Sequence, residues 1–193
     1  WRIEIKKYPE LTRVGSVRGE TLIGHHHTSS EYDKTPHGGY YTQKQIREIV
    51  KYAADRYITV IPEIELPGHA VAALTSYPWL GCKGEGYEVR RRWGISKEVF
   101  CPGKETTFEF LQNVFAEVLE LFPSEFIHIG GDECPKDSWK QCPLCQERIR
   151  TEGLKDEFEL QSYTVRRMEK WLREHGRKTV SYTHLRAHET DQY

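Results

Sequence analysis

The chain has 193 residues, of which 37% are hydrophobic and 30% are charged, and its net charge is −1. This length is enough for one domain with a hydrophobic core, and the near-neutral charge gives no reason to expect nucleic acid or an acidic membrane as a partner. No apolar run approaches the ~20 residues of a membrane-spanning helix. The chain begins at Trp1 rather than Met, so we expect it to open inside a longer sequence that carries any targeting segment.

The N-terminal part predicts little regular structure. Residues 1–8 alternate briefly before Pro9, which is typical of a short extended piece, and residues 9–41 form a long polar loop. His25, His26 and His27 stand in a row in this loop. Because consecutive side chains diverge, three adjacent histidines rarely bind one metal together, and we interpret them as part of the polar loop.

The first strong helix is predicted over about 43–56. Thr42 and Gln45 form a Thr-x-x-Gln capping box, and the apolar residues that follow recur at helical spacing. A strand is predicted next over 58–65, and its many β-branched residues suit a strand that is covered on both faces. The strand ends in a Pro-Gly turn that carries His69.

A long loop over 67–105 separates this strand from two further helices, each of which is followed by a strand. The first of these helices is predicted to begin at a capping box of Thr106 and Glu109 and to end before Pro123. The second is predicted to begin at a cap of Asp156 and Glu159 and to end at Gly176. The strands that follow are predicted over 126–129 and from Lys178 onward. Short αβ turns and long βα loops predict a parallel α/β fold with its chemistry at the carboxyl ends of the strands. An open doubly wound sheet and a (β/α)8 barrel both fit, and the lack of a Gly-x-Gly-x-x-Gly motif after a strand counts against a dinucleotide fold.

The strand over 126–129 leads into two glycines, Gly130 and Gly131, and then two adjacent acids, Asp132 and Glu133. Glycine lets the chain turn sharply and lets a ligand approach the backbone. Two like charges side by side raise the pKa of one of them, which is how proteins make a general acid for neutral pH. A solvated acidic loop is the alternative, but the hydrophobic strand and the double glycine favour a site.

The five cysteines leave several arrangements open. Cys82 and Cys101 flank a glycine-rich stretch, so either a disulfide in an oxidising compartment or two free thiols fits. Cys142 and Cys145 have the two-residue spacing of a zinc knuckle or a redox pair. A zinc site needs two further ligands at a similar spacing, and only Cys134 is a candidate. We therefore expect no metal in this chain.

Several motifs in order resemble the family-20 glycoside hydrolases, the β-N-acetylhexosaminidases. The central motif is the His-x-Gly-Gly-Asp-Glu sequence that ends at Glu133, and three further stretches match in the same order: 1–9, 38–42 and 62–69. The resemblance runs from Trp1 to about Val180. It implies that residues 1–180 are part of a catalytic (β/α)8 TIM barrel, with three to four of the eight βα units.

The resemblance also implies an activity, which is the retaining exo-hydrolysis of terminal β-linked N-acetylglucosamine or N-acetylgalactosamine. In this family the substrate's own 2-acetamido oxygen attacks the anomeric carbon. Glu133 matches the general acid and base, Asp132 the residue that holds the acetamido N–H, and His69 the histidine that supports the acid. A packed loop histidine is the alternative for His69. Further candidates for substrate binding or support are Glu63, Glu65 and His128.

The resemblance implies no cofactor or metal. The expected partner is an N-acetylhexosamine-containing oligosaccharide or glycoconjugate. The parent protein is expected to be secreted, periplasmic or on the cell surface. Residues 181–193 depart from the family pattern, and we interpret them as a foreign tail. The family's sugar-binding arginine and later barrel strands have no match here, so we expect the 193 residues alone to be inactive. Two other functions stay open, a non-catalytic carbohydrate-binding protein on the same fold and a metal-dependent hydrolase that uses His25, His26, His27, His69, Asp132 and the cysteines.

Overall fold

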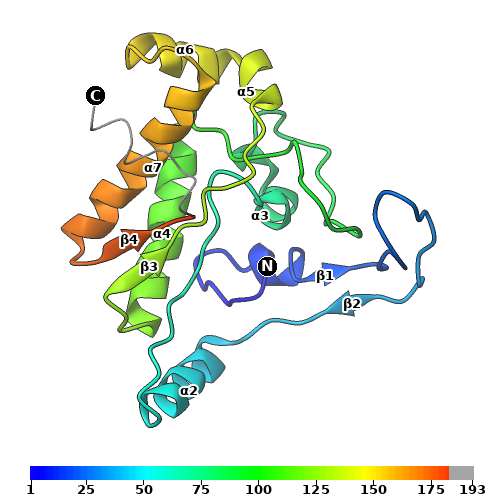
Figure 1. Cartoon of the computed structure of the whole chain (residues 1–193), viewed down its shortest axis with the longest axis vertical. Helices are drawn as coiled ribbons and strands as arrows, with labels where there is room; N and C mark the ends of the chain where they lie inside the picture. The colour runs from blue at the N-terminus through cyan, green and yellow to red at the C-terminus, as the bar shows by residue number, and fades with distance from the viewer. Residues whose placement is uncertain (183–193) are drawn as a thin grey trace.

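The computed structural model describes residues 1–182, which fold into an α/β arrangement (Figure 1). The first half contains α1 Glu10–Arg13, β1 Val17–Arg18, β2 His37–Gly38, α2 Gln43–Ala54, α3 Val71–Ser76 and the 3-10 helix η1 Pro78–Leu80. The second half contains α4 Glu105–Leu121, β3 Phe126–His128, α5 Asp137–Gln141, α6 Pro143–Thr151, α7 Glu157–Glu174 and β4 Lys178–Val180. Within this part of the chain, no helix has the length and apolar character needed to cross a membrane. Most of the predicted tail, from residue 183 onward, lies outside the described residues.

Three extended segments run parallel through the middle of the molecule. On one side β3 pairs with β4. On the other side β3 pairs with residues 62–66, where the Ile64 N–H donates to the His128 carbonyl (3.0 Å) and the Leu66 N–H donates to the Ile129 carbonyl (3.1 Å). The predicted parallel α/β order is therefore confirmed, and the carboxyl ends of the three segments point the same way. The described segments do not close into a barrel.

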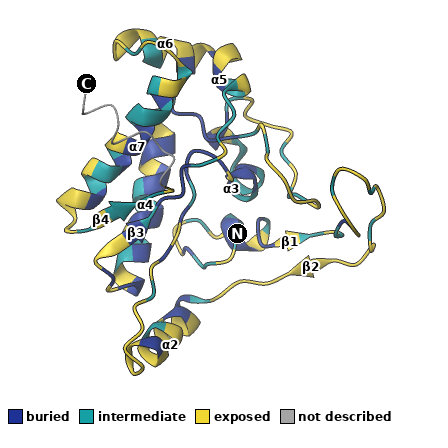
Figure 2. Ribbon diagram, viewed as in Figure 1, coloured by how far each residue is buried: buried dark blue, intermediate teal, exposed yellow. Residues whose placement is uncertain are grey.

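The hydrophobic core is built around α4, which contacts α2 on one side and α7 on the other. Figure 2 shows α4 as a mostly buried helix behind β3. Its buried side chains are Thr107, Phe108, Phe110, Leu111, Val114, Phe115, Val118 and Leu121. The core holds two of the three parallel segments in place, because Ile64 and Leu66 of segment 62–66 and Ile127 and Ile129 of β3 and its end pack into the same cluster.

The helix starts were predicted with mixed success. The capping box of α2 is present, with the Thr42 N–H donating to the Gln45 side chain at 2.9 Å, and Asp156 caps α7 as expected. The box predicted at Thr106 is wrong, because α4 begins at Glu105 after Lys104, which makes no side-chain cap. Lys104 instead donates from Nζ to carbonyls of the preceding loop, so tertiary contacts fix where this helix begins.

The strand predicted over 58–65 forms only in its last part, and it is not covered on both faces. Ile58 is 58% exposed and Ile61 is 47% exposed, whereas Ile64 is 7% exposed. The reason is that pairing with β3 begins at Pro62, whose carbonyl accepts the His128 N–H. Earlier residues of this stretch have no strand partner in the described part of the chain.

Two long loops are ordered and contain helices that the sequence pattern did not reveal. The loop over 67–105 contains α3 and η1, and the loop after Glu133 contains α5 and α6. With six residues in α3 and five in α5, these helices are too short for a periodic pattern to stand out. They shape the surroundings of the strand ends, where the candidate site lies.

Candidate active site

The three residues predicted to be catalytic lie together at the carboxyl ends of the parallel segments. His69 Nε2 lies 3.3 Å from Glu133 Oε2 and 3.9 Å from Asp132 Oδ1. The Glu133 side chain is 45% exposed and that of Asp132 is 20% exposed, so Glu133 is open to a ligand while Asp132 lies deeper. The fold thus assembles an imidazole and two carboxylates into one site. His69 follows segment 62–66, and the two acids follow β3.

The backbone at this site adopts uncommon conformations. His69 and Glu133 both lie in the left-handed region, with φ of 49° and 43°. Such conformations of non-glycine residues cost ~1–3 kcal/mol and are concentrated at functional sites. Gly68 allows the two loops to meet, because a Cβ at this position would lie 2.9 Å from the Asp132 carbonyl oxygen. This close approach holds His69 against Glu133.

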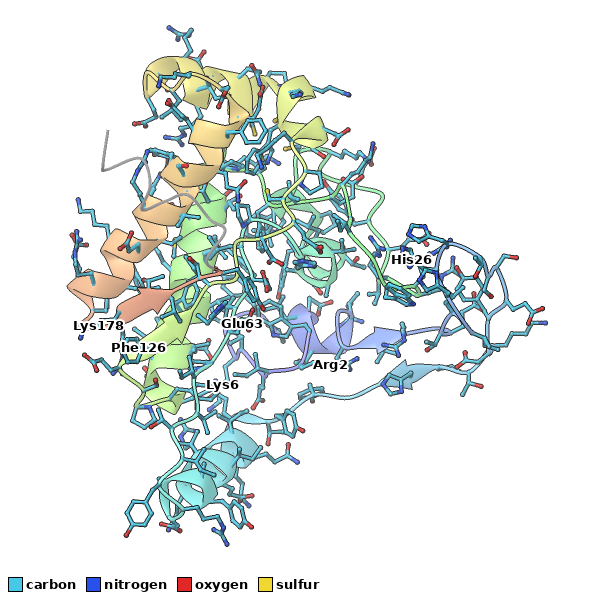
Figure 3. All side chains as sticks on the ribbon, in the orientation of Figure 1. Arg2, Lys6, His26, Glu63, Phe126 and Lys178 are labelled. Atoms are coloured by element: carbon cyan, nitrogen blue, oxygen red, sulfur yellow. The ribbon has the colours of Figure 1, made fainter. Side chains whose placement is uncertain are left out.

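A second polar group lies beside the site, at the paired ends of segment 62–66 and β3. Glu63 Oε1 lies 3.3 Å from His128 Nδ1 and accepts a hydrogen bond of 2.9 Å from the Tyr182 hydroxyl. The Gly130 N–H donates to His128 Nδ1 at 3.0 Å, which connects this group to the glycine turn before the acids. Figure 3 shows Glu63 near the centre of the molecule, close to the end of β3.

Tyr182 is the residue of this group that sequence reasoning missed. It falls in the segment predicted to be a foreign tail, so no motif marked it. Its backbone N–H donates to the Gly130 carbonyl at 3.2 Å, and its ring lies edge-on to the His128 ring, with centroids 4.8 Å apart. The start of the predicted tail therefore contacts the site.

Glu65 lies between Glu63 and Asp132. Burial raises the pKa of Glu65 to about 8, and its hydrogen bond to Glu63 and the charge of Asp132 act in the same direction. Burial also disfavours ionised Glu63, but the hydrogen bonds from Glu65 and Tyr182 outweigh this and lower the pKa of Glu63. Glu65 therefore carries a proton at neutral pH. Glu65 Oε2 and Asp132 Oδ1 are buried and have no hydrogen-bond partner among residues 1–182.

His69 lines three hollows, and two of them also contain acids of the site. One has a volume of about 390 Å³, within the usual range of small-molecule sites, and its lining includes Trp1, Tyr41, Glu63, Glu65 and His69. The other is a wider depression of about 1030 Å³ that Glu133 and His69 share with Trp93. Trp93 is 55% exposed, so part of its ring is open to a ligand in this depression.

The three adjacent histidines do not join the site as metal ligands. Their rings contact one another in tilted arrangements, and those of His25 and His26 also contact Trp93, whose ring centroid lies 3.9 Å from that of His26. Figure 3 shows His26 at the edge of the molecule, well away from Glu63. Among the described residues, the group near the acids with ligand atoms close enough to hold a metal is His69, Asp132 and Glu133.

The cysteines adopt an arrangement that the sequence did not predict. All five are free, so the Cys82–Cys101 disulfide does not form. The reason is that the Cys101 sulfur faces Cys142 and Cys145, at 3.7 and 3.5 Å. Cys134, the candidate third zinc ligand, lies outside the group of sulfurs that lie within 4.8 Å of one another.

Comparison with known proteins gives consistent matches. The model of the catalytic domain of glycosyl hydrolase family 20 matches residues 1–192. A β-hexosaminidase of Porphyromonas gingivalis is 52% identical over 185 residues, which cover 96% of this chain and 22% of that protein. A β-hexosaminidase of Vibrio furnissii is 43% identical over 183 residues, which cover 94% of this chain and 30% of that protein.

Solved structures agree with these matches. A β-N-acetylhexosaminidase from Bacteroides fragilis superposes with a TM-score of 0.76 at 44% identity, covering 94% of this chain and 32% of that one. An exo-β-N-acetylglucosaminidase from Vibrio harveyi, in complex with N-acetylglucosamine, superposes with a TM-score of 0.77 at 36% identity. The match covers 94% of this chain and 28% of that one.

These matches place the α/β fold and its paired carboxylates among the glycoside hydrolases. Within that class, the chain belongs to glycosyl hydrolase family 20, which confirms the resemblance seen in the motifs. The chain spans between 22% and 32% of the length of the relatives described above.

Proposed function

We propose that the protein carrying this chain removes terminal β-linked N-acetylglucosamine or N-acetylgalactosamine from glycans, with retention of configuration. The observation that supports this best is the pairing of an open Glu133 carboxylate, 3.3 Å from His69, with a less exposed Asp132. Asp132 Oδ1 has no donor among the described residues, so it can accept an amide N–H. The names of the relatives point to the same chemistry.

In the first proposed step, Glu133 donates a proton to the glycosidic oxygen as its bond to the anomeric carbon breaks. The 2-acetamido oxygen of the substrate attacks that carbon and forms an oxazolinium-like intermediate. Asp132 accepts the acetamido N–H and balances the positive charge that develops. No protein nucleophile has to lie across the sugar ring, so two adjacent acids are sufficient.

In the second proposed step, the Glu133 carboxylate takes a proton from a water molecule. The water attacks the anomeric carbon from the face that the leaving group occupied, and the oxazolinium ring opens to give the free sugar. His69 positions Glu133 through their contact during both proton transfers.

We also propose that segment 62–66, β3 and β4 are strands of a (β/α)8 barrel, because they are parallel and carry the acids at their carboxyl ends. On this proposal the isolated 193 residues expose strand edges, so they are inactive and aggregate or remain partly folded. Turnover of an aryl N-acetylglucosaminide by the purified 193-residue chain contradicts this part. A secreted, periplasmic or cell-surface location of the parent protein belongs to the same proposal and is checked by cell fractionation.

The main test uses the full-length protein and an aryl N-acetylglucosaminide. The variant Glu133→Gln is expected to lose ~10²–10⁴-fold in kcat, whereas Glu85→Gln, at an exposed loop position, should behave like the wild type. Near-normal turnover by Glu133→Gln contradicts the assignment. Sugar binding without turnover by the wild type favours a carbohydrate-binding protein, and immediate loss of activity on chelation, with the fold retained, favours a metal-dependent hydrolase.

A further inference from the structure

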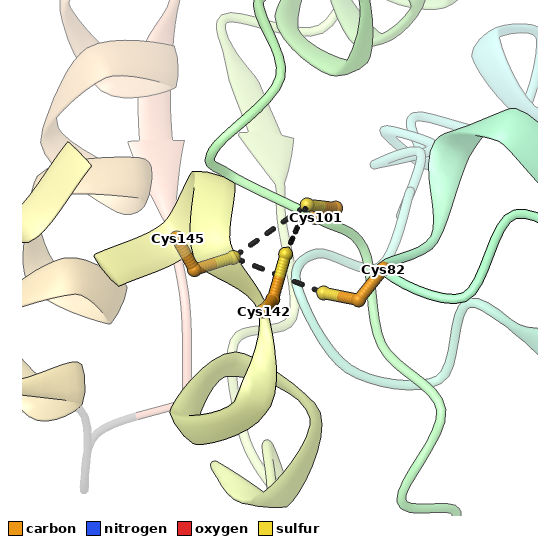
Figure 4. A group of neighbouring side chains, drawn as sticks. All are labelled: Cys82, Cys101, Cys142 and Cys145. Carbon is orange, nitrogen blue, oxygen red and sulfur yellow. Dashed lines mark hydrogen bonds between the residues drawn. The ribbon is translucent and has the colours of Figure 1, made fainter. Parts of the chain in front are cut away.

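Four cysteine sulfurs converge on one another (Figure 4), in a group separate from that of His69, Asp132 and Glu133. Cys82 Sγ lies 3.8 Å from Cys145 Sγ, and Cys101 Sγ lies 3.7 Å from Cys142 Sγ and 3.5 Å from Cys145 Sγ. All four sulfurs lie within 4.8 Å of one another. These separations are far longer than a disulfide bond of about 2.05 Å, so the cluster consists of four separate thiols.

The spacing of the sulfurs matches a tetrahedral metal site. Four thiolates at about 2.3 Å from a Zn²⁺ ion lie roughly 3.8 Å from one another, which is the edge of the tetrahedron. The three measured distances, 3.5 to 3.8 Å, lie close to this edge. Tetrahedral sets of four sulfur ligands are typical of Zn²⁺ or iron–sulfur centres.

Each half of the cluster is held by its own local structure. The bridge between Gly81 and Phe100 brings the neighbouring residues, Cys82 and Cys101, to the same place. Cys142 and Cys145 lie at the start of α6, where the helix dipole favours thiolates. This Cys-x-x-Cys spacing is that of a zinc knuckle.

The two halves are pressed together around the cluster. A Cβ at Gly103 would lie 2.5 Å from the backbone nitrogen of Cys145, so only glycine permits this approach. The fully buried Trp139 donates from its indole nitrogen to the Phe100 carbonyl at 2.8 Å. Cys101, Cys142 and Cys145 are themselves buried, which gives the pre-formed, water-excluded surroundings of a structural site.

We propose that Cys82, Cys101, Cys142 and Cys145 together bind one structural Zn²⁺ ion. Since four protein ligands fill a tetrahedral site, no position remains for water or substrate, and the ion has no part in the hydrolysis. Its role is to join the loop after α3 to the start of α6. The first segment belongs to the loop that carries His69, and the second belongs to the loop that follows Glu133. The ion therefore stabilises both loops that carry residues of the candidate site.

The first test is metal analysis of the full-length protein, purified in reductant and without added metal. We expect ~1 zinc per chain by elemental mass spectrometry. Replacement by Co²⁺ should give the absorption of a tetrahedral tetrathiolate site, including a sulfur-to-cobalt charge-transfer band that a surface site on the three adjacent histidines lacks. Bound iron in place of zinc, no tightly bound metal, or a cobalt spectrum without the thiolate band overturns the proposal.

The second test uses matched serine variants. Cys142→Ser and Cys145→Ser should each lower the zinc content at least ~10-fold and lower the thermal midpoint. Cys134→Ser, which replaces a cysteine of the same loop outside the cluster, should keep the zinc. If a cluster variant fails to fold, alkylation and mass spectrometry of the wild type still decide the question. Two disulfides among the four cysteines overturn the proposal, whereas four thiols that resist alkylation until zinc is removed support it.

Discussion

The imidazole of His69 and the carboxylate of Glu133 lie 3.3 Å apart, although one follows segment 62–66 and the other follows β3. Their backbones both adopt the left-handed conformation, with φ of 49° and 43°. The contact therefore depends on two strained turns that meet, and it fixes the direction in which the Glu133 carboxylate points.

Replacement of His69 by alanine in the full-length protein should reduce kcat by ~10–100-fold, less than the loss for the general acid itself. The reason is that Glu133 remains in place but loses the imidazole that lies 3.3 Å from its carboxylate and orients it. The pH–rate profile should change shape as well, which a purely structural role would not produce. The control is His37→Ala on the exposed strand β2. An unchanged kcat and pH profile for His69→Ala contradicts the positioning role.

Replacement of Asp132 by asparagine should damage mainly the reaction of N-acetylated substrates. Asparagine keeps the size of the side chain but removes the negative charge that the proposed oxazolinium-like intermediate needs, and loss of such stabilisation costs ~10²–10³-fold. The measurement compares an aryl 2-acetamido glycoside with the matching 2-hydroxy glycoside, whose slow reaction should change little. Equal fractional losses on the two substrates count against the role of Asp132.

The parts of the fold that could be predicted from the sequence are those that local patterns determine. The capping box at Thr42 and the cap at Asp156 depend on neighbouring residues, so both appear in the structure. The start of α4 could not be predicted, because Lys104 is placed by carbonyls of a loop more than twenty residues earlier. The exposure of Ile58 and Ile61 depends on which strands are paired, which periodicity does not report.

In the candidate site, too, features set by neighbouring residues could be predicted, and features set by contacts between distant residues could not. The acids Asp132 and Glu133 were marked by their place after a strand and two glycines, but their connection to His69 came from the family resemblance rather than from physical reasoning. The cysteine cluster could not be predicted, because its closest contacts join residues 41 to 63 positions apart. A pattern search at short spacing finds only the Cys142 and Cys145 pair.

Replacement of Gly130 by alanine should destabilise the protein more than replacement of Gly153. Both glycines have φ of +64°, so both alanines carry a similar backbone cost of roughly 1–2 kcal/mol. A Cβ at Gly130 would also lie 1.8 Å from Glu65 Oε2, whereas no atom lies within 4 Å of a Cβ at Gly153. The Glu65 carboxyl must then move and lose its hydrogen bond to Glu63, so denaturant unfolding should show an additional loss of ~1 kcal/mol for Gly130→Ala. Equal losses for the two variants contradict the close approach of Glu65.

Replacement of Glu65 by glutamine should change how stability depends on pH. The pKa of Glu65 is about 8 in the folded chain, because of burial first and then of its hydrogen bond to Glu63, against 4.5 for an ordinary glutamate. Between these two pH values the folded state binds more protons than the unfolded state, so the free energy of unfolding falls as the pH rises. Glutamine does not titrate, and its amide can still donate to Glu63, so this fall should disappear.

The thermal midpoints of the wild type and Glu65→Gln in the full-length protein should therefore diverge from about pH 5 to pH 8, with the variant more stable at the alkaline end. Because the carboxyl is only half buried, solvent screening limits the expected gain to ~1 kcal/mol. Glu85→Gln, at an exposed glutamate, is the control and should follow the wild type throughout. A constant difference between Glu65→Gln and the wild type across this range means that Glu65 does not hold its proton in the folded chain.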